Sequence, residues 1–369
     1  MNRPGFGRLG IYVLGRTIAG ATIAFAVITS LILLIDLVET ARDLGVRAEV
    51  SFTQILGLTL LKTPALMLVL LPFAFLFGTL GAFVALNRSS ELTAMRAAGV
   101  SAWRFIAPAG VAAFLVGVLA VTAVNPAAAY LNAEFEAIRA RLMENYLDDA
   151  PKDVWLRQGD ERTQMVIHAQ SRSLEDGKAV LKGVSLFIYQ KNAEGIPEFR
   201  RRLEAREARL LPGFWRLTDV REASPGAGAV RTEQLSLPST LDPKGAVERF
   251  ATPNEIAFWR LPAAIAQTEQ AGFGAGAYRL RLQQLLATPL LLAAMAVMAA
   301  AFSLRLVRLG GMAMVAGSGV ALGFIFYFLN AFSGALAKAG LISAFSAAWA
   351  PPAVVMLCGV TLLCYTEDG

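Results

Sequence analysis

Six long stretches without a charged residue, three before residue 134 and three after residue 281, flank a polar middle segment. A bilayer core roughly 30 Å thick requires about 20 apolar residues per helix, and every stretch is long enough. The sequence therefore predicts a polytopic membrane protein with six membrane-spanning helices and one large insert. The stretches lie between Arg16 and Asp36, Lys62 and Arg88, Arg104 and Glu134, Arg281 and Arg305, Arg308 and Lys338, and Lys338 and Glu367.

The insert changes from a helical to a strand-like pattern. Residues 134–147 continue the third span as a polar helix, which the turn residues 148–151 end. Beyond them, β-branched and aromatic residues recur in short runs between turn residues, which is typical of an antiparallel sandwich or curled sheet. The expected strands are residues 163–169, 184–189, 199–210, 214–220 and 231–237. A short helical pattern at residues 255–267 is either a connector on the bilayer surface or a lever that transmits helix motion.

These patterns divide the chain into three parts. We expect a first transmembrane half at residues 1–147, a β-domain at 148–252, and an interfacial helix with the second transmembrane half at 253–369. The composition agrees, because 56% hydrophobic residues, 17% charged residues and a mean hydropathy of +0.53 do not fit one soluble globule.

Lysine and arginine in the short loops predict the orientation, because cytoplasmic loops carry an excess of them. With a cytoplasmic N-terminus, the inner loops hold eight such residues and the outer short loops hold four. The β-domain is then periplasmic. The inner residues are Arg3, Arg8, Arg16, Arg88, Arg96, Arg104, Arg305 and Arg308, and the outer ones are Arg42, Arg47, Lys62 and Lys338. The net charge of +6 is explained by basic residues beside an anionic leaflet rather than by nucleic acid.

Catalytic patterns are missing from the sequence. The single histidine, His168, has no cysteine or acidic pair at metal-ligand spacing, and Gly177 and Lys178 lack the preceding glycine of a phosphate loop. The deep interior of the spans holds no ionisable residue, since Asp36 and Lys338 lie at span edges, which disfavours an ion-driven transporter. We therefore expect a protein that is not an enzyme, uses no cofactor or metal, and takes energy from a partner.

The inner loop at residues 88–99, with the sequence RSSELTAMRAAG, has the pattern of a short helix. Ser89 or Ser90 is suited to cap it, Glu91 lies in the first turn, where the helix dipole favours an anion, and Gly99 is suited to end it. The residues that share one face are Leu92, Met95 and Arg96. A helix of about two turns is unstable alone in water, so it docks either on a cytoplasmic partner or on the protein itself.

At this loop the chain resembles the LptF/LptG family of lipopolysaccharide-export permeases, and LptG more than LptF. The similarity covers both membrane halves and the insert. The matching segments are residues 88–99, IDLVE at 35–39, DLG at 43–45, WRL at 215–217, FWRLP at 258–262, AGF at 271–273 and YRLR at 278–281.

The resemblance implies a protein of the bacterial inner membrane with six helices and a periplasmic antiparallel β-jelly-roll. Its partners would be an LptF-like permease, a cytoplasmic dimer of an LptB-like ATPase, and an LptC-like bridge protein that receives lipopolysaccharide. Segment 88–99 would be the coupling helix that enters a groove on the ATPase. A cavity between the two permeases, gated near the first and fifth spans, would admit the lipid. The coupling residues implied are Glu91 as the ionic contact, Leu92 and Met95 as apolar contacts, and Arg96 and Gly99 of the same motif.

The lipid contacts implied by the resemblance fall at the outer rim and inside the β-domain. Relatives carry lysine within or just after the first span, where this chain has Leu33, Leu34, Glu39 and Thr40. Phosphate contacts would then come from arginines that are alternatively ordinary interfacial anchors: Arg42, Arg139, Arg141, Arg279 and Arg281. A lipid path through the jelly-roll would use inward positions that are alternatively ordinary core residues: Val166, Leu186, Ile188, Leu217 and Leu235.

Two other functions remain open at this point. One is a related mechanotransmitting permease that acts on lipoproteins or peptides, which the molecule bound by the purified protein would distinguish. The other is a non-transporting membrane adaptor whose β-domain binds periplasmic ligands, which would not recruit an ATPase.

Overall fold

The structure is a computed structural model that describes residues 7–45, 50–144, 154–159, 163–175, 178–192, 197–211, 214–225, 228–239, 253–270, 274–306 and 312–367. The chain forms two compact units. The helical unit comprises residues 1–142, 253–261 and 276–369, and the β-unit comprises residues 143–252 and 262–275.

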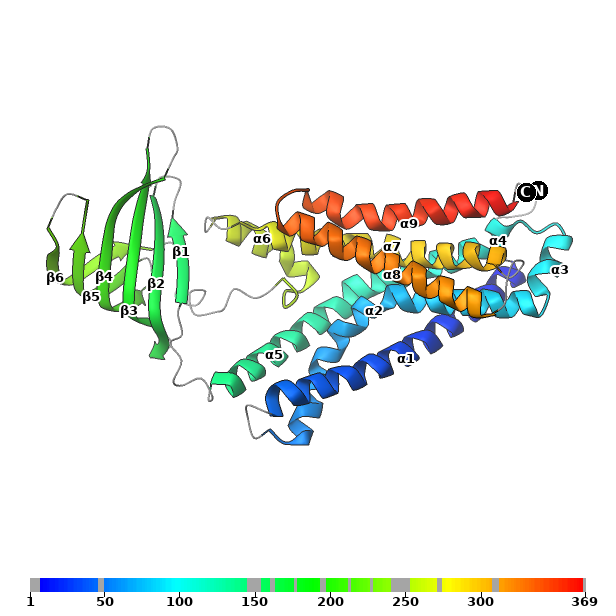
Figure 1. Ribbon diagram of the computed structural model, residues 1–369, viewed down its shortest axis with the longest axis horizontal. Helices are drawn as coiled ribbons and strands as arrows, with labels where there is room; N and C mark the ends of the chain where they lie inside the picture. Colours follow the sequence, from blue (N-terminus) through cyan, green and yellow to red (C-terminus); the bar gives the residue numbers. More distant parts are fainter. Residues whose placement is uncertain are drawn as a thin grey trace. The chain divides into compact units, whose positions relative to one another are not determined.

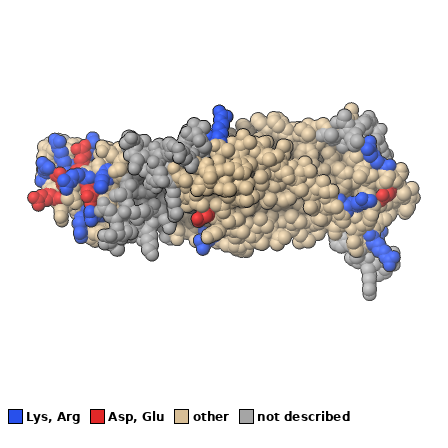
Figure 2. Space-filling view, turned by 90° about the horizontal axis from the view of Figure 1, so that it is seen from below, with Lys and Arg blue, Asp and Glu red and all other residues tan. Residues whose placement is uncertain are grey.

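Six helical segments among the described residues are long and apolar enough to cross a membrane, as predicted (Figure 1). The third segment is continuous through α4, the π-helical turn η1 and α5, and the short helix α3 (Glu91–Ala97) precedes it. The longer elements are α1 (Arg8–Gly45), α2 (Phe52–Arg88), α4 (Ala102–Leu119), η1 (Ala120–Val124), α5 (Asn125–Glu144), α7 (Gly276–Leu306), α8 (Met312–Lys338) and α9 (Ala344–Glu367). On the face drawn in Figure 2, the helical unit carries a broad belt without charged residues, as a lipid-facing surface requires.

The two ends of the helical unit differ in what they connect. At one end, here called the α3 end, α1 begins, α9 ends and α3 joins α2 to α4. At the other, the insert end, α5 leads out of the helical unit and η2 (Phe258–Arg260) leads back into it. The predicted helix at residues 255–267 is observed slightly later, as η2 followed by α6 (Leu261–Gln270).

Helix α7 lies at the centre of the helical unit, where it packs against α9, α4, α2 and α8. In its most apolar window 67% of the residues are buried, against 11% for α1 and 17% for α8. The first and fifth spans therefore turn most of their apolar surface outwards. Extended apolar surface of this kind marks contact with lipid or with another protein.

Small residues let the helices approach closely, as in other membrane bundles. Helix α1 touches α2 through backbone, because a Cβ atom on Gly78 would lie only 2.3 Å from the Cα atom of Ala21. Likewise, a Cβ atom on Gly117 of α4 would lie 2.5 Å from the Cα atom of Pro289 in α7. These two crossings fix the position of α1 on α2 and of α4 on α7.

The β-unit contains one antiparallel sheet of six described strands, in which each strand pairs with its neighbours in the chain. The predicted inserted antiparallel β-domain is thus confirmed, and β1 has no counterpart among the predicted strands. Among the described strands the order is an up-and-down meander, without the crossing connections of a jelly-roll. The strands are β1 (Val154–Gly159), β2 (Thr163–Glu175), β3 (Lys178–Lys191), β4 (Pro197–Leu211), β5 (Phe214–Ala223) and β6 (Val230–Pro238).

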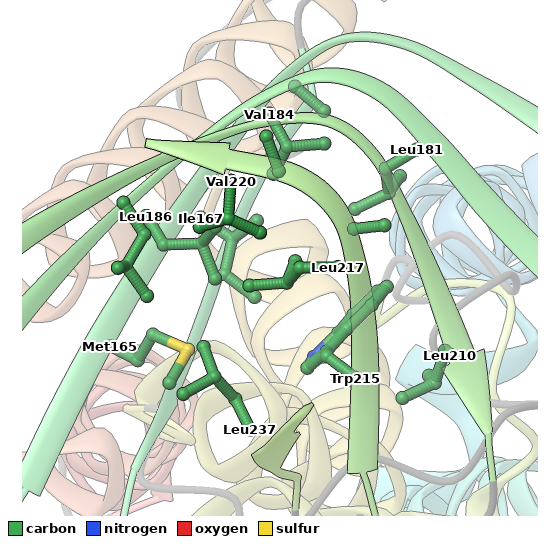
Figure 3. Packing of buried hydrophobic residues seen from close by; sticks show 14 of the residues in the cluster. Met165, Ile167, Leu181, Val184, Leu186, Leu210, Trp215, Leu217, Val220 and Leu237 are labelled. Atoms are coloured by element: carbon green, nitrogen blue, oxygen red, sulfur yellow. The ribbon is translucent and has the colours of Figure 1, made fainter. Parts of the chain in front are cut away.

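The sheet curves along a line that crosses five strands. The pairing skips one position in each of them, at Gln170, Gly183, Arg206, Asp219 and Glu233. Gly183 and Asp219 have positive φ angles of 62° and 57°. Such an irregularity bends a strand and changes which positions face inwards. The sheet can therefore wrap around its apolar residues, which point towards one another inside the curve (Figure 3).

We expect Gly183→Ala to destabilise the β-unit by about 1–3 kcal/mol. An alanine would have to keep a φ of 62°, and its Cβ atom would lie 2.6 Å from Oε1 of Gln170. The Gln170 side chain can turn away, but the backbone penalty remains. Hydrogen exchange of the full chain, followed by mass spectrometry, should show faster exchange in β3 and β4. Gly228→Ala is the control, because no described atom lies within 4 Å of its added Cβ. Equal exchange in both variants would contradict the expectation.

Candidate functional sites

Helix α3 forms where the sequence predicted a short helix, over Glu91–Ala97 within the segment 88–99. Ser90 precedes it with a φ of 61°, so the chain turns sharply between α2 and α3. Gly99 ends it with a φ of 78°, a conformation that glycine adopts without strain. The Gly99 and Val100 amides donate to the carbonyls of Arg96 and Met95, which caps the last turn.

The apolar face of α3 packs inwards against the helical unit. Leu92 is 1% exposed and shares a cluster with side chains of α1, α2, α4, α7 and α9, and Met95 lies partly buried on the same cluster. The sequence left open whether α3 docks on a cytoplasmic partner or on the protein itself. Leu92 and Met95 pack against the protein itself. The surface that α3 leaves uncovered consists of Thr93, Ala94 and Ala97.

The carboxylate of Glu91 is linked to α1. Ser89 Oγ donates to Glu91 Oε1 over 2.8 Å, and Arg16 Nε of α1 donates to the hydroxyl of Tyr12 over 3.1 Å. The Ser89 hydroxyl, then the Tyr12 hydroxyl, and finally the nearby Arg16 charge lower the pKa of Glu91 below its ordinary value. Glu91 is therefore ionised at neutral pH, in the first turn of α3, where the dipole favours a negative charge.

Arg96 links α3 to α9. Its Nη2 atom donates to the carbonyl oxygen of Thr366 over 2.9 Å, at the end of α9. This hydrogen bond satisfies a carbonyl that the helix end would otherwise leave open. With Glu91 beside α1 and Arg96 on α9, the seven-residue helix is joined by polar contacts to the first and last spans.

The five predicted rim arginines lie in different surroundings at the insert end. Arg42 and Arg279 are exposed. Arg139 is 3.9 Å from Asp43 and 3.7 Å from Glu136, and thus connects α5 to α1. The side chain of Arg141 lies outside the described residues. Arg281 differs from the rest, because its side chain lines a cavity inside the helical unit.

A buried ion pair that the sequence did not predict joins α1 to α2. Asp36, 5% exposed, accepts a hydrogen bond from Lys62, with 2.5 Å between Oδ1 and Nζ. Lys62 also lies 5.8 Å from the centroid of the Phe135 ring in α5. The lengths of the uncharged stretches placed Asp36 at the edge of the first span and gave no partner for it. The pair could have been predicted because Asp36 ends one apolar stretch and Lys62 begins the next, so that opposite charges meet in an antiparallel helical hairpin.

The inner face of the sheet forms one apolar cluster around the fully buried Trp215. Leu186, Ile188 and Leu217 belong to it and Leu235 packs against it, as their predicted inward orientation requires. The inward orientation predicted for Val166 is wrong. Val166 pairs with Phe187 and lies between the inward residues Met165 and Ile167, so it points to the opposite face. An offset of one residue reverses every facing along a strand.

The arrangement defines a polytopic membrane protein in which an antiparallel β-unit interrupts two halves of three spans each. A family model with the description "Lipopolysaccharide export system permease LptF/LptG" matches residues 11–365. The chain therefore belongs to the LptF/LptG family of lipopolysaccharide-export permeases, and it is a multi-pass protein of the inner membrane. A comparison with the curated proteins gives no match.

Proposed function

We propose that the chain is the LptG-type permease subunit of an ATP-driven exporter. It extracts lipopolysaccharide from the inner membrane and passes it through the β-unit towards the outer membrane. Its partners are an LptF-like permease, a dimer of an LptB-like ATPase and an LptC-like bridge protein. The preference for LptG over LptF rests on the sequence motifs, above all on residues 88–99.

The observation that carries the proposal is how α3 is attached. Leu92 sits in a cluster that five long helices share, and Glu91 and Arg96 add polar contacts beside α1 and to α9. Because protein interiors are close-packed, a push on α3 moves these helices instead of being absorbed. The exposed small residues Thr93, Ala94 and Ala97, with the charge of Glu91 beside them, are then the surface on which the ATPase acts.

The proposed orientation places the α3 end in the cytoplasm. Arg88 and Arg104 flank α3 and Arg96 lies within it, and cytoplasmic loops are the ones enriched in such residues. The insert end is then periplasmic, and the β-unit follows it on the same side of the membrane.

The lipid pathway in this proposal follows the outward helices. The apolar faces of α1 and α8 meet the paired permease and border the opening through which lipid enters. Arg42, Arg139 and Arg279 lie at the insert end and contact headgroup phosphates in this proposal. The apolar inner face of the sheet, with Leu186, Ile188, Leu217 and Leu235, offers a surface for acyl chains.

The proposal is tested by purifying the chain with everything that accompanies it. The chain is expressed in its native host at its normal level, isolated in mild detergent, and examined by mass spectrometry for subunits and bound lipid. We expect an ATPase, a second permease of the same family and lipopolysaccharide. Bound lipoprotein in place of lipopolysaccharide would indicate the related mechanotransmitting class. A preparation that never contains an ATPase would indicate an adaptor.

A further inference from the structure

A π-helical turn, η1, interrupts the third span near the insert end. The Asn125 amide donates to the carbonyl of Ala120, one residue further back than the partner that an α-helix would use. The α-helical donor for the Thr122 carbonyl would be residue 126, which is a proline and has no N–H. The Thr122 carbonyl therefore lacks its α-helical partner. Turns of this kind inside a helix are frequent at functional sites.

The segment that returns from the insert supplies a donor for this carbonyl. The indole nitrogen Nε1 of Trp259, in η2, donates to the Thr122 carbonyl over 3.1 Å. The Phe258 ring meets the Trp259 ring edge-on, with 5.0 Å between the two centroids. The returning chain thus completes the hydrogen bonding of the third span.

A side chain of the third span in turn completes the hydrogen bonding of η2. The residue before η2 is Ala257, which has no side-chain oxygen to cap a helix. Instead, Asn125 Oδ1 accepts a hydrogen bond from the Phe258 backbone amide over 2.8 Å. Asn125 is 2% exposed, and a buried carboxamide is costly unless it is hydrogen-bonded. The two segments therefore exchange hydrogen bonds, one in each direction.

Apolar side chains surround these two hydrogen bonds. Val121 of η1, Leu261 at the start of α6 and Leu285 of α7 form one buried cluster. The partly buried residues that pack against it are Ile256, Phe258, Tyr278 and Leu282. We call the two hydrogen bonds and this cluster the joint. It ties η1 and η2 to α7 as well as to each other.

Both chain connections of the insert begin at the joint. Helix α5 starts at Asn125 and leads out of the helical unit, and η2 starts at Phe258 and continues as α6 into residues of the β-unit. These two residues lie 133 positions apart in the sequence, and the β-strands lie between them. Because helices are stiff, a displacement of the joint moves the starts of α5 and α6 together.

The helices that contact α3 at one end of the helical unit also reach the joint. The cluster around Leu92 includes side chains of α4 and α7 at the α3 end. Helix α4 continues directly into η1, and α7 contributes Leu285 to the joint. A movement of α3 therefore has a continuous, packed route through α4 and α7 to the insert end.

We propose that the joint transmits movement of the transmembrane helices to the β-unit, with Asn125 as the positioning residue. Residues 255–267 then act as the lever, the second of the two roles left open by the sequence. This role rests on the proposed function, because the movement that it transmits is the one that the ATPase produces at α3.

The test combines a measurement on the full chain alone with one on the complete complex. Spin labels are attached at Leu341→Cys, in the exposed turn between α8 and α9, and at Ala223→Cys on β5, after Cys358 and Cys364 have been replaced by serine. Double electron–electron resonance in lipid nanodiscs gives the distribution of the distance between the labels. The complex in vesicles gives the lipid transferred per ATP hydrolysed.

The double variant Asn125→Leu with Trp259→Phe removes both hydrogen bonds and keeps side chains of similar size. We expect it to broaden the distance distribution and to lower the lipid transferred per ATP about fivefold or more, with ATP hydrolysis kept. Asn125→Asp should restore both readouts, because it keeps the accepting oxygen at a helix start that favours an anion. Trp349→Phe is the matched control. It removes an indole hydrogen bond of 3.0 Å to Gln283 outside the joint, and it should behave like the wild type.

Several results would overturn this role of the joint. Equal distance distributions in the wild type and the double variant would show that the joint does not hold the insert. A broader distribution with unchanged lipid per ATP would show that it holds the insert without transmitting movement. A parallel loss of ATP hydrolysis and transfer, or an equal loss in Trp349→Phe, would show a general structural defect. If the double variant does not fold, Trp259→Phe alone replaces it and the same results decide.

The two measurements also separate the joint from the proposed function. A wild-type complex that moves no lipid would contradict the proposed function. The spin-label comparison needs no ATPase and no export, so it would still decide whether the joint holds the insert.

Discussion

Glu91→Lys should abolish export, with at least a tenfold loss of transported lipid, while the protein still inserts into the membrane. The lysine would stand beside Arg16 and at the N-terminus of α3, where both the neighbouring charge and the helix dipole disfavour a cation. It would also lose the hydrogen bond from Ser89. Lipid transport in vesicles that contain the complete complex measures the effect, and the amount of membrane-inserted protein is measured alongside.

Glu134→Lys is the matched control, because it reverses an exposed charge far from α3 on the helix that leads to the insert. It should leave export unchanged. A second comparison separates the two roles that Glu91 has in this account. Ser89→Ala with Tyr12→Phe removes the intramolecular hydroxyls but keeps the carboxylate. Export that survives in this double variant but fails in Glu91→Lys would assign the carboxylate mainly to the ATPase. Normal export in Glu91→Lys would contradict the coupling role of α3.

Gly78→Ala should lower the stability of the helical unit by about 1–3 kcal/mol and displace α1 from α2. The added Cβ atom would lie 2.3 Å from Cα of Ala21 and 2.4 Å from its amide nitrogen, and backbone atoms cannot turn aside. Because α1 is the least buried span, this crossing and the pair of Asp36 with Lys62 are main features of its attachment. We therefore expect a lower thermal midpoint in detergent and reduced export.

Gly81→Ala, three residues further along α2, provides the control. No described atom lies within 4 Å of its added Cβ, and alanine favours a helix over glycine by up to about 1 kcal/mol. Its thermal midpoint should stay the same or rise. Equal losses in the two variants would show that the close crossing of α1 and α2 does not hold the first span.

The membrane part of the fold was predictable because one strong constraint governs it. Lipid excludes charge over a fixed thickness, so uncharged stretches of sufficient length identify spans without any alignment. The uncharged stretches do not predict structure beyond the hydrocarbon. They placed Asp36 at a span edge, whereas α1 continues to Gly45 and buries that carboxylate against Lys62. Once a helix leaves the hydrocarbon, its charges are governed by packing partners, which hydropathy does not report.

The candidate sites were predictable in type but only partly in orientation. The end of α3 at Gly99 was predicted correctly, because it depends on neighbours in the chain. The predicted serine cap at its start is not observed, since Ser90 precedes α3 without a side-chain capping hydrogen bond. Whether Leu92 faced a partner or the protein itself depended on five distant helices. In the sheet, alternation gave the right face for Leu186 and Ile188 but the wrong one for Val166. Strand register is set by pairing, and the phase change at Gly183 and Asp219 appears only in the assembled sheet.

Coupling to a cytoplasmic ATPase requires α3 to lie on the cytoplasmic side of the membrane, which cysteine labelling can measure. Cys358 and Cys364 are exposed, so both are first replaced by serine. Ala94→Cys on α3 and Ala223→Cys on β5 are then treated separately with a membrane-impermeant maleimide, in cells whose outer membrane alone has been opened. We expect labelling of the Ala223→Cys variant in these cells and of the Ala94→Cys variant only after the inner membrane is lysed. Labelling of the Ala94→Cys variant before lysis would contradict it, because no cytoplasmic ATPase could then reach α3.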